Sequence, residues 1–312
     1  MRSFDHKGKQ LKPLVLVLLA TYNGKPWLEE QLDSILQQCA VNFKVVVSDD
    51  LSSDGTWEWL RQFSEKDSRV TLLPHTGKYG CAARNFFRLL RDVDLSHFDY
   101  VCFADQDDIW DLGKLRQSIN MICAENVDAF SSDVMAFWPD GRERLISKAQ
   151  PMREWDHFFE SPGPGCTFMM KAEVARKIAD FLRKNQKAVE GVALHDWFVY
   201  AWVRSNGYKW WIDPLPTVRY RQHNSNEFGA NAGMRAIAWR WGKLLKGWYR
   251  DQVLLTARLL GQSDAWPIRR LARLNLFDRF VLVASVGKFR RLWHHRLVLA
   301  AALLLMRRNN EN

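Results

Sequence analysis

The first 130 residues alternate between short apolar runs and stretches in which apolar residues recur at helical spacing. Runs with this length and content are typical of strands that are covered on both faces. The runs that we expect to be strands are 14–20, 43–47, 70–73 and 100–104. The helical stretches begin near Pro26, Trp57, Ala82 and Asp111. This alternation predicts an α/β domain with a mainly parallel sheet flanked by helices.

The pattern is less regular after Asp128. The apolar stretches that we expect to be strands there are 129–138, 168–170, 210–212 and 218–223. Helices are predicted over about 171–184 and after Leu194. From about 233 onward the chain is helical in pattern, basic and rich in tryptophan, with residues such as Trp239, Trp241, Trp248, Trp266 and Trp293.

Polar residues gather where the predicted strands end. Tyr22, Asp50 and the segment Asp105–Asp108 all follow apolar runs, and in parallel sheets functional residues collect at the carboxyl ends of strands. Three carboxylates within four residues repel one another, and a divalent cation commonly offsets that repulsion. Hard oxygen ligands favour Mg²⁺ or Mn²⁺. The alternative is a solvated turn in which Asp111 caps the following helix.

The net charge of +10 is unevenly distributed along the 312 residues. Residues 229–312 contain sixteen Lys and Arg against four Asp and Glu, so the basic excess belongs to the C-terminal quarter. Amphipathic helices that lie on an anionic membrane surface fit this composition. The apolar run Leu297–Met306 is too short to span a bilayer. The alternative is that these helices pack on the rest of the chain with a solvated basic face.

Five cysteines are present, an odd number without metal-binding spacing. We interpret them as reduced core residues of a cytosolic protein. The N-terminus lacks a secretion-signal pattern, since its first apolar run begins at Leu14.

Several motifs together resemble family-2 glycosyltransferases with the GT-A fold, over about residues 13–225. They are Ala20–Gly24, Ser48–Thr56, Arg84–Asn85 and Asp105–Trp110. Pro164–Thr167, His195–Trp197 and Tyr220–Asn224 are similar to rhamnosyltransferases that build bacterial surface polysaccharides. Asn224 stands where that branch has a glycine. The resemblance implies a catalytic domain over 1–228, with a nucleotide half at 13–127 and an acceptor half at 128–228. Residues 229–312 would form a membrane-associating extension.

The resemblance also implies residue roles. Asp107 would bind the metal, with His223 completing the site, and Asp50 would read the base of the nucleotide. Asp196 would be the catalytic base that takes the proton of the acceptor hydroxyl. The residues implied for nucleotide-sugar binding are Thr21, Tyr22, Asn23, Asp50, Arg84 and Asp105. Those implied for the acceptor and sugar pocket are Gly165, Cys166, Thr167, His195 and Trp197.

For several of these residues a structural role is also open. Tyr22 could pack in the core, Arg84 could form a surface ion pair, His223 could be structural, and Asp196 could be a helix N-cap.

The sequence therefore predicts a metal-dependent, inverting glycosyltransferase. Its donor would be dTDP-rhamnose, with a UDP-sugar as the alternative. Its acceptor would be a lipid-linked saccharide at the cytoplasmic face of the inner membrane. Three other classes remain open: a nucleotidyltransferase, a basic nucleic-acid-binding protein and an inactive scaffold. The first lacks its Gly-rich phosphate loop, because Thr21–Gly24 is not one. For the second, the carboxylate clusters would repel phosphate, so we expect no nucleic-acid partner.

Overall fold

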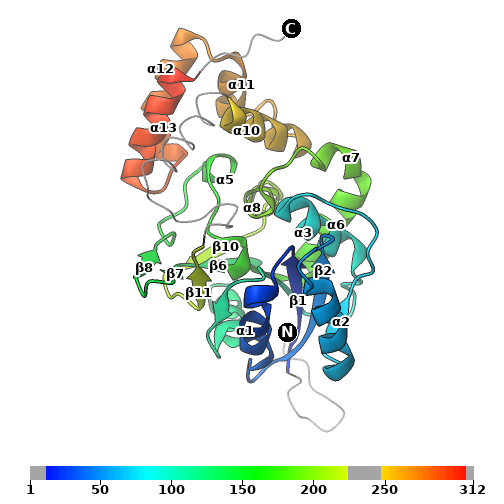
Figure 1. Cartoon of the computed structure of the whole chain (residues 1–312). Helices are drawn as coiled ribbons and strands as arrows, with labels where there is room; N and C mark the ends of the chain where they lie inside the picture. Colours follow the sequence, from blue (N-terminus) through cyan, green and yellow to red (C-terminus); the bar gives the residue numbers. More distant parts are fainter. Residues whose placement is uncertain (1–11, 224–246, 307–312) are drawn as a thin grey trace.

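The computed structural model describes residues 12–223 and 247–306, and all structural statements concern those residues (Figure 1). A central seven-stranded sheet has the order β10-β6-β9-β4-β1-β2-β3. Its strands are β1 (Leu14–Thr21), β2 (Asn42–Asp49), β3 (Val70–Leu72), β4 (Tyr100–Ala104), β6 (Ala129–Ser132), β9 (Met169–Lys171) and β10 (Trp210–Asp213). Only β9 runs antiparallel to its neighbours, β4 and β6. The predicted mixed, mainly parallel sheet is confirmed.

Helices cover both faces of this sheet because its central strands are apolar on both sides. In β1, Leu16 and Leu18 face one cluster of buried residues, and Val15 and Val17 face the other. The first cluster is completed by α3 (Ala82–Asp92), α6 (Ala172–Lys184) and α8 (His195–Ser205). The second is completed by α1 (Lys25–Leu36), α2 (Thr56–Lys66) and α4 (Lys114–Ala124).

A second, four-stranded sheet was not predicted. It has the order β5-β11-β7-β8, with β5 (Ile109–Trp110), β11 (Val218–Arg221), β7 (Val134–Phe137) and β8 (Glu143–Ile146). The helix expected near Asp111 therefore begins only at Lys114, since 109–110 pair with β11. The expected strand 129–138 is broken at Asp133, whose buried carboxylate accepts hydrogen bonds from the N–H groups of Lys148 and Ala149.

The C-terminal helices pack on the α/β domain. They are α10 (Trp248–Leu259), α11 (Trp266–Arg273), α12 (Leu276–Ala284) and α13 (Trp293–Leu305). Phe158 and Phe159, in the short helix α5 (Asp156–Phe159), and Trp197 in α8 share a buried cluster with Tyr249 and Phe289 of this region. The C-terminal helices therefore pack on the α/β domain, as the alternative interpretation of the sequence predicted. Their outer face remains exposed. The domain boundary expected at 228, Trp239 and Trp241 lie outside the described residues.

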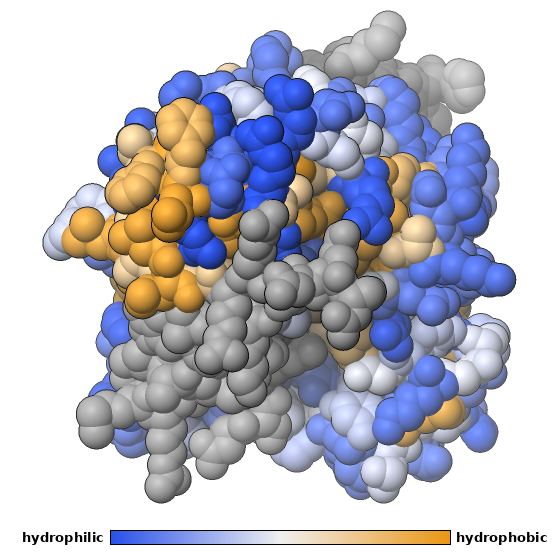
Figure 2. All heavy atoms as spheres, turned by 90° about the horizontal axis from the view of Figure 1, so that it is seen from above, coloured by the Kyte–Doolittle hydropathy of each residue, from blue (hydrophilic) through white to orange (hydrophobic). Residues whose placement is uncertain are grey.

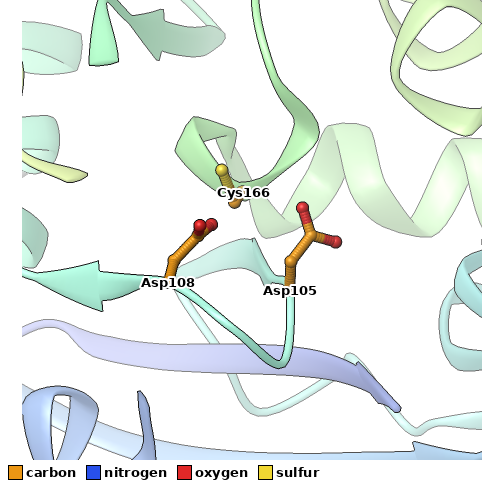
Figure 3. Close-up of side chains that lie close together, drawn as sticks. All are labelled: Asp105, Asp108 and Cys166. Atoms are coloured by element: carbon orange, nitrogen blue, oxygen red, sulfur yellow. The ribbon is translucent and has the colours of Figure 1, made fainter. Parts of the chain in front are cut away.

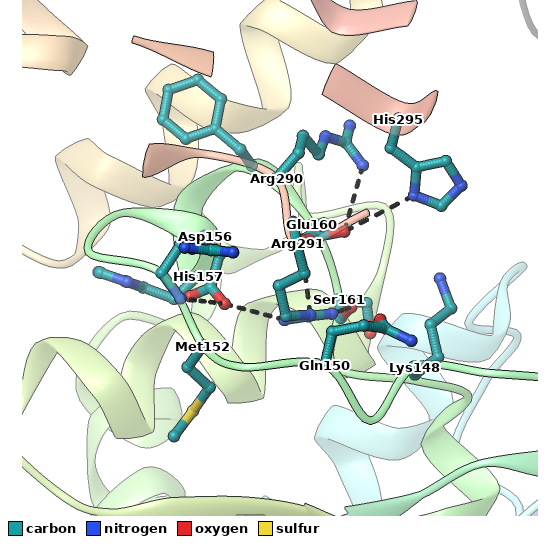
Figure 4. Close-up of polar contacts among 12 residues, drawn as sticks. Lys148, Gln150, Met152, Asp156, His157, Glu160, Ser161, Arg290, Arg291 and His295 are labelled. Atoms are coloured by element: carbon teal, nitrogen blue, oxygen red, sulfur yellow. Dashed lines mark hydrogen bonds and ion pairs between the residues drawn. The ribbon is translucent and has the colours of Figure 1, made fainter. Parts of the chain in front are cut away.

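Buried ion pairs reinforce this junction (Figure 4). The Arg291 side chain, which is 1% exposed, donates from Nη1 to Asp156 at 3.0 Å and from Nη2 to the Ser161 carbonyl at 2.6 Å. Its backbone N–H donates to Glu160 at 2.7 Å. Asp156 also pairs with Arg204 of α8 at 3.2 Å. The junction therefore combines apolar contact with a network of buried charges.

All five cysteines are free thiols, but the expectation that they are core residues is wrong for some of them. Cys102 and Cys166 are buried, whereas Cys39 and Cys123 are exposed and Cys81 is intermediate. The exposed pair lies just after α1 and near the end of α4, where the apolar stripes of these helices no longer determine the burial of neighbouring residues. None of the helices within 12–223 and 247–306 combines the length and the apolar character needed to cross a membrane.

Candidate active site

A cavity of about 990 Å³ opens at the carboxyl ends of β1, β2 and β4. The parallel register places Thr21 opposite Asp49 and Leu19 opposite Ala104, so the segments after these strands meet at one edge. Most of the remaining lining comes from the loop before α3 with the start of that helix, the loop after β8, the segment 161–165, and the starts of α8 and α13. The predicted site residues that line the cavity are Tyr22, Asp50, Asp105, Asp107, Gly165, His195 and Asp196.

Other predicted site residues support the cavity from outside its lining. Thr21 donates from its hydroxyl to Asp49 at 3.0 Å, and Asn23 accepts from the Ser53 N–H at 2.8 Å. Arg84 donates to backbone carbonyls of Tyr79 and Glu190. These contacts hold the loops around the cavity.

Three residues expected in the acceptor pocket, Cys166, Thr167 and Trp197, do not line the cavity. Cys166 and Thr167 are fully buried in the short turn Gly165–Thr167, and the Thr167 hydroxyl donates to the Pro164 carbonyl. Trp197 donates from its indole to the His157 carbonyl and stacks on Tyr249. Its ring therefore packs in the junction with the C-terminal helices and does not face the cavity.

Asp50 is only 3% exposed, and both of its carboxylate oxygens accept backbone hydrogen bonds. The N–H of Tyr79 donates to one oxygen, and the N–H of Gly80 donates to the other at 2.7 Å. The loop before α3 thus binds the carboxylate that is expected to read the base. Its second lone pairs remain available to a further donor in the cavity.

Tyr22 is 45% exposed at the rim of the cavity, with the Lys78 ammonium 5.2 Å from its ring centre. Gln106 fixes the backbone of Tyr22 by accepting from its N–H at 2.8 Å and donating to its carbonyl at 3.0 Å. A Cβ at Gly24 would lie 2.2 Å from the Gln106 side-chain oxygen, so a larger residue there would displace Gln106 from this position. The segment after β1 and the acidic segment after β4 are therefore locked together.

The second sheet brings His223 to Asp107. The antiparallel pairing of β11 with β5 places Arg219 opposite Ile109, and continuation of this register carries residue 223 alongside the acidic segment. His223 Nε2 lies 2.7 Å from Asp107 Oδ2, and the imidazole stacks on Trp27 with ring centres 4.0 Å apart. Two residues that are 116 positions apart thus share one contact.

Ligand atoms of Asp105, Asp108 and Cys166 also lie within 4.8 Å of one another (Figure 3). Asp108 is fully buried, and one of its carboxylate oxygens has no hydrogen-bond partner. Burial, with the neighbouring Asp107 and Asp105 carboxylates, raises the pKa of Asp108 well above its usual value. Crowded carboxylates with an imidazole beside them are a donor set that fits Mg²⁺ or Mn²⁺.

Asp196 stands at the start of α8 and lines the cavity. One carboxylate oxygen accepts from the Trp197 N–H at 2.7 Å, and the other accepts from the Ser161 hydroxyl at 3.0 Å. Burial raises the pKa of this carboxyl, although both hydrogen bonds and the nearby Lys148 charge oppose the rise. A carboxylate with a raised pKa is a stronger base, as proton abstraction from a hydroxyl requires.

His195 is buried beside Asp196 and is held by aromatic rings. Its imidazole stacks on Phe86 with ring centres 4.0 Å apart, and its Nε2 has no hydrogen-bond partner. Burial lowers the pKa of His195 to about 3, so the ring is neutral at pH 7. A Cβ at Gly165 would lie 2.5 Å from Nε2. The glycine of the 163–167 loop therefore makes room for the histidine.

Several residues that contribute to the site were given no role from the sequence. Asn85, which belongs to the Arg84–Asn85 motif, is buried and donates to the carbonyls of Thr21 and Ser48, which joins β1 to β2. Lys148 and Ser161 lie in loops without any motif, and only the fold brings them to Asp196. The paired histidines His294 and His295 could have been noticed, because two titratable residues stand at the start of a predicted helix.

Comparison with known proteins agrees with this architecture. Residues 16–178 match the family described as Glycosyl transferase family 2. The "dTDP-rhamnosyl transferase RfbG" of Shigella flexneri is 39% identical over 92% of this chain and 99% of its own length. S. aureus TarS in complex with UDP superposes with a TM-score of 0.53 at 15% identity, covering 94% of this chain and 89% of that chain. The mannosyltransferase PcManGT from Pyrobaculum calidifontis, solved with GDP-Man and Mn²⁺, gives a TM-score of 0.52 at 20% identity, with 94% and 81% coverage.

Proposed function

This chain belongs to glycosyl transferase family 2 and is a glycosyltransferase, and we propose that it moves rhamnose from dTDP-rhamnose to a lipid-linked saccharide with inversion at the anomeric carbon. The observation that carries the proposal is the cavity itself. It is lined by Asp50, Asp105 and Asp107 from the strand ends and by Asp196 from the start of α8. The residues proposed to bind the nucleotide and the proposed base therefore line one cavity.

Asp50 and Tyr22 would hold the base of the donor. An uncommitted lone pair of the Asp50 carboxylate accepts from N3–H of thymine, a donor that uracil also offers. The similarity to a dTDP-rhamnosyl transferase over nearly its full length favours the thymine nucleotide. A UDP-sugar donor is the second candidate because this recognition does not distinguish the two bases.

Asp107 and His223, together with Asp105, would hold a divalent cation. When bound, the cation neutralises charge on the diphosphate of the donor. Mn²⁺ in the PcManGT structure supports a divalent metal in this fold. The chain itself contributes the rigid placement of these ligands, through the pairing of β5 with β11 and the lock between Gln106 and Tyr22.

Asp196 would act as the base of the transfer reaction. Its carboxylate accepts the proton of the acceptor hydroxyl while that oxygen attacks the anomeric carbon of the sugar. Ser161 and the Trp197 N–H hold the carboxylate in place. The neighbouring His195 is neutral, so it adds no positive charge that would lower the basicity of the carboxylate. Proton acceptance by one carboxylate is the chemistry that an inverting transfer requires.

The acceptor side of the proposal rests on the outer face of the C-terminal helices. Large apolar side chains on α12 and α13 are mostly exposed there, and Figure 2 shows apolar residues gathered on this part of the molecule. They are Leu276, Phe277, Phe280, Trp293, Leu297, Val298, Leu304 and Leu305, and we call them the α12–α13 patch. An apolar patch next to basic residues fits the interface of an anionic membrane, at its cytoplasmic side.

Thermal unfolding with dTDP and Mn²⁺ tests the donor site. A ligand at one hundred times its dissociation constant adds about 2.7 kcal/mol of stability, which a melting curve resolves. We expect metal-dependent stabilisation by dTDP that is lost in Asp107→Ala and kept in Asp111→Ala, an exposed control just after β5. Equal stabilisation of both variants would remove Asp107 from the site.

Flotation with vesicles that contain phosphatidylglycerol tests the membrane contact. We expect the protein to float with these vesicles and the double variant Phe277→Glu, Phe280→Glu to remain in solution. Leu112→Glu is the matched control, because Leu112 is 57% exposed on the α/β domain. Flotation that is unchanged in the double variant would show that the α12–α13 patch does not contact lipid.

A further inference from the structure

The cavity is lined by basic as well as acidic side chains. Asp50, Asp105 and Asp107 line it at the strand ends. Lys148, from the loop after β8, lines it together with His294 and His295 from the first turn of α13. A divalent cation accounts for the carboxylates at the strand ends, but the proposed donor site gives no role to this basic group.

Lys148 is a cation without a partner. Asp133 fixes its backbone, yet its ammonium makes no hydrogen bond or ion pair to any residue of the described chain. Burial lowers the pKa of Lys148, which reflects the cost of keeping this charge away from water. A cation held in this way is stabilised by an anion that enters the cavity.

The carboxylates whose charges act on Lys148 are Glu160 and Asp196, and both already have other partners. Asp196 accepts hydrogen bonds from the Ser161 hydroxyl and the Trp197 N–H. Glu160 lies 3.5 Å from Arg291, 3.8 Å from Arg290 and 3.9 Å from His295. Figure 4 shows Lys148 and His295 on the same side of this network. The Lys148 ammonium hydrogen-bonds to neither of these carboxylates, and Lys148 lines the cavity.

We propose that Lys148, His294 and His295 form an anion subsite for the phosphate groups that join the acceptor saccharide to its lipid. This inference rests on the proposed function. Saccharides built on a lipid carrier are linked to it through phosphate. An ammonium and imidazole N–H groups at the start of a helix are suited to bind such groups.

The position of this subsite favours the acceptor over the donor as the source of the phosphate. Asp50, the expected base reader, lies among the strand ends. His294 and His295 instead belong to α13, on which Trp293 is 68% and Leu297 62% exposed. A lipid whose phosphate binds at His294 and His295 can therefore extend its chain over the same helix.

Isothermal titration calorimetry with geranyl diphosphate tests the subsite in the full-length protein. The protein is first saturated with dTDP and Mg²⁺, so that the donor diphosphate position is filled. We expect geranyl diphosphate to bind and geraniol, which has the same chain without the phosphates, to bind at least tenfold more weakly. Lys148→Gln should weaken geranyl diphosphate binding at least tenfold and leave dTDP binding unchanged.

Two further variants separate the loss of charge from damage to the fold. Lys148→Arg keeps the charge and should bind geranyl diphosphate within threefold of the wild type. Lys177→Gln removes an exposed lysine of α6 outside the cavity and should have no effect. Melting temperatures of the variants show whether each is folded.

Three results would overturn the inference. Equal binding of geraniol and geranyl diphosphate would mean that no anion is recognised. Undiminished geranyl diphosphate binding in Lys148→Gln would remove Lys148 from the subsite. Weaker dTDP binding in that variant would mean that Lys148 belongs to the donor site.

A fourth outcome separates the two proposals. If the wild type binds geranyl diphosphate but no nucleotide, the subsite stands and the proposed function fails.

Discussion

The buried guanidinium of Arg291 gives the sharpest prediction about stability. Arg291→Met keeps the apolar stem of the side chain but removes the charge between Asp156 and Glu160. Both carboxylates are buried, at 0% and 6% exposure, and Arg291 is their shared partner. Removing one partner of a buried ion pair typically lowers the free energy of unfolding by about 3–5 kcal/mol, because the remaining charge stays buried without compensation.

The magnitude for this chain lies at the lower end of that range. Asp156 keeps Arg204 at 3.2 Å and the Tyr200 hydroxyl at 3.1 Å, and Glu160 keeps the longer contact with Arg290. We therefore expect Arg291→Met to lower the free energy of unfolding by about 3 kcal/mol. Loss of the bond to the Ser161 carbonyl would also loosen the loop whose hydroxyl holds Asp196.

Urea unfolding followed by tryptophan fluorescence measures this effect. The matched control is Arg142→Met, which removes an ion pair to Asp140 of 2.7 Å between side chains that are 71% and 53% exposed. Exposed pairs contribute about 0.2–1 kcal/mol, so the control should change stability by less than 1 kcal/mol. Similar losses in the two variants would refute the reasoning that burial sets the value of the ion pair.

Three further predictions concern the cavity and its surroundings. Asp196→Asn should lower kcat about 10²–10⁴-fold with dTDP binding unchanged, and turnover within a few-fold of wild type would remove Asp196 as the base. Gly165→Ala should cost about 1–3 kcal/mol in urea unfolding, because its Cβ meets an imidazole, whereas Gly113→Ala meets nothing within 4 Å and should be neutral. Burial, and then the Arg204 charge, lowers the pKa of His157 to about 3, so stability should fall as pH drops below 6.5, where the unfolded state takes up the proton first. His157→Phe should reduce the slope of that pH dependence between 6.5 and 4, with the contribution of His195 remaining, and an unchanged slope would contradict it.

The sequence by itself determined the central sheet and the edge where function collects. Continuous apolar runs such as Leu14–Ala20 can be buried on both faces only between two layers of helices, and this forces the parallel α/β arrangement. Because the carboxyl ends of parallel strands meet at one edge, Tyr22, Asp50 and Asp105 were predicted to lie together. These are local patterns combined with one topological rule, so they can be read directly from the residues.

Only the tertiary structure decided which of the polar residues face the cavity. Thr21 and Trp197 carry the same sequence signals as their neighbours, yet side-chain hydrogen bonds turn the first toward Asp49 and the second into the junction with the C-terminal helices. The contact between Asp107 and His223 depends on the short pairing of β5 with β11, which no periodicity reveals. Lys148 reaches the cavity through an unpatterned loop held by a distant carboxylate. Interactions between residues far apart in the chain leave no local pattern, and for that reason they emerge only when the chain is folded.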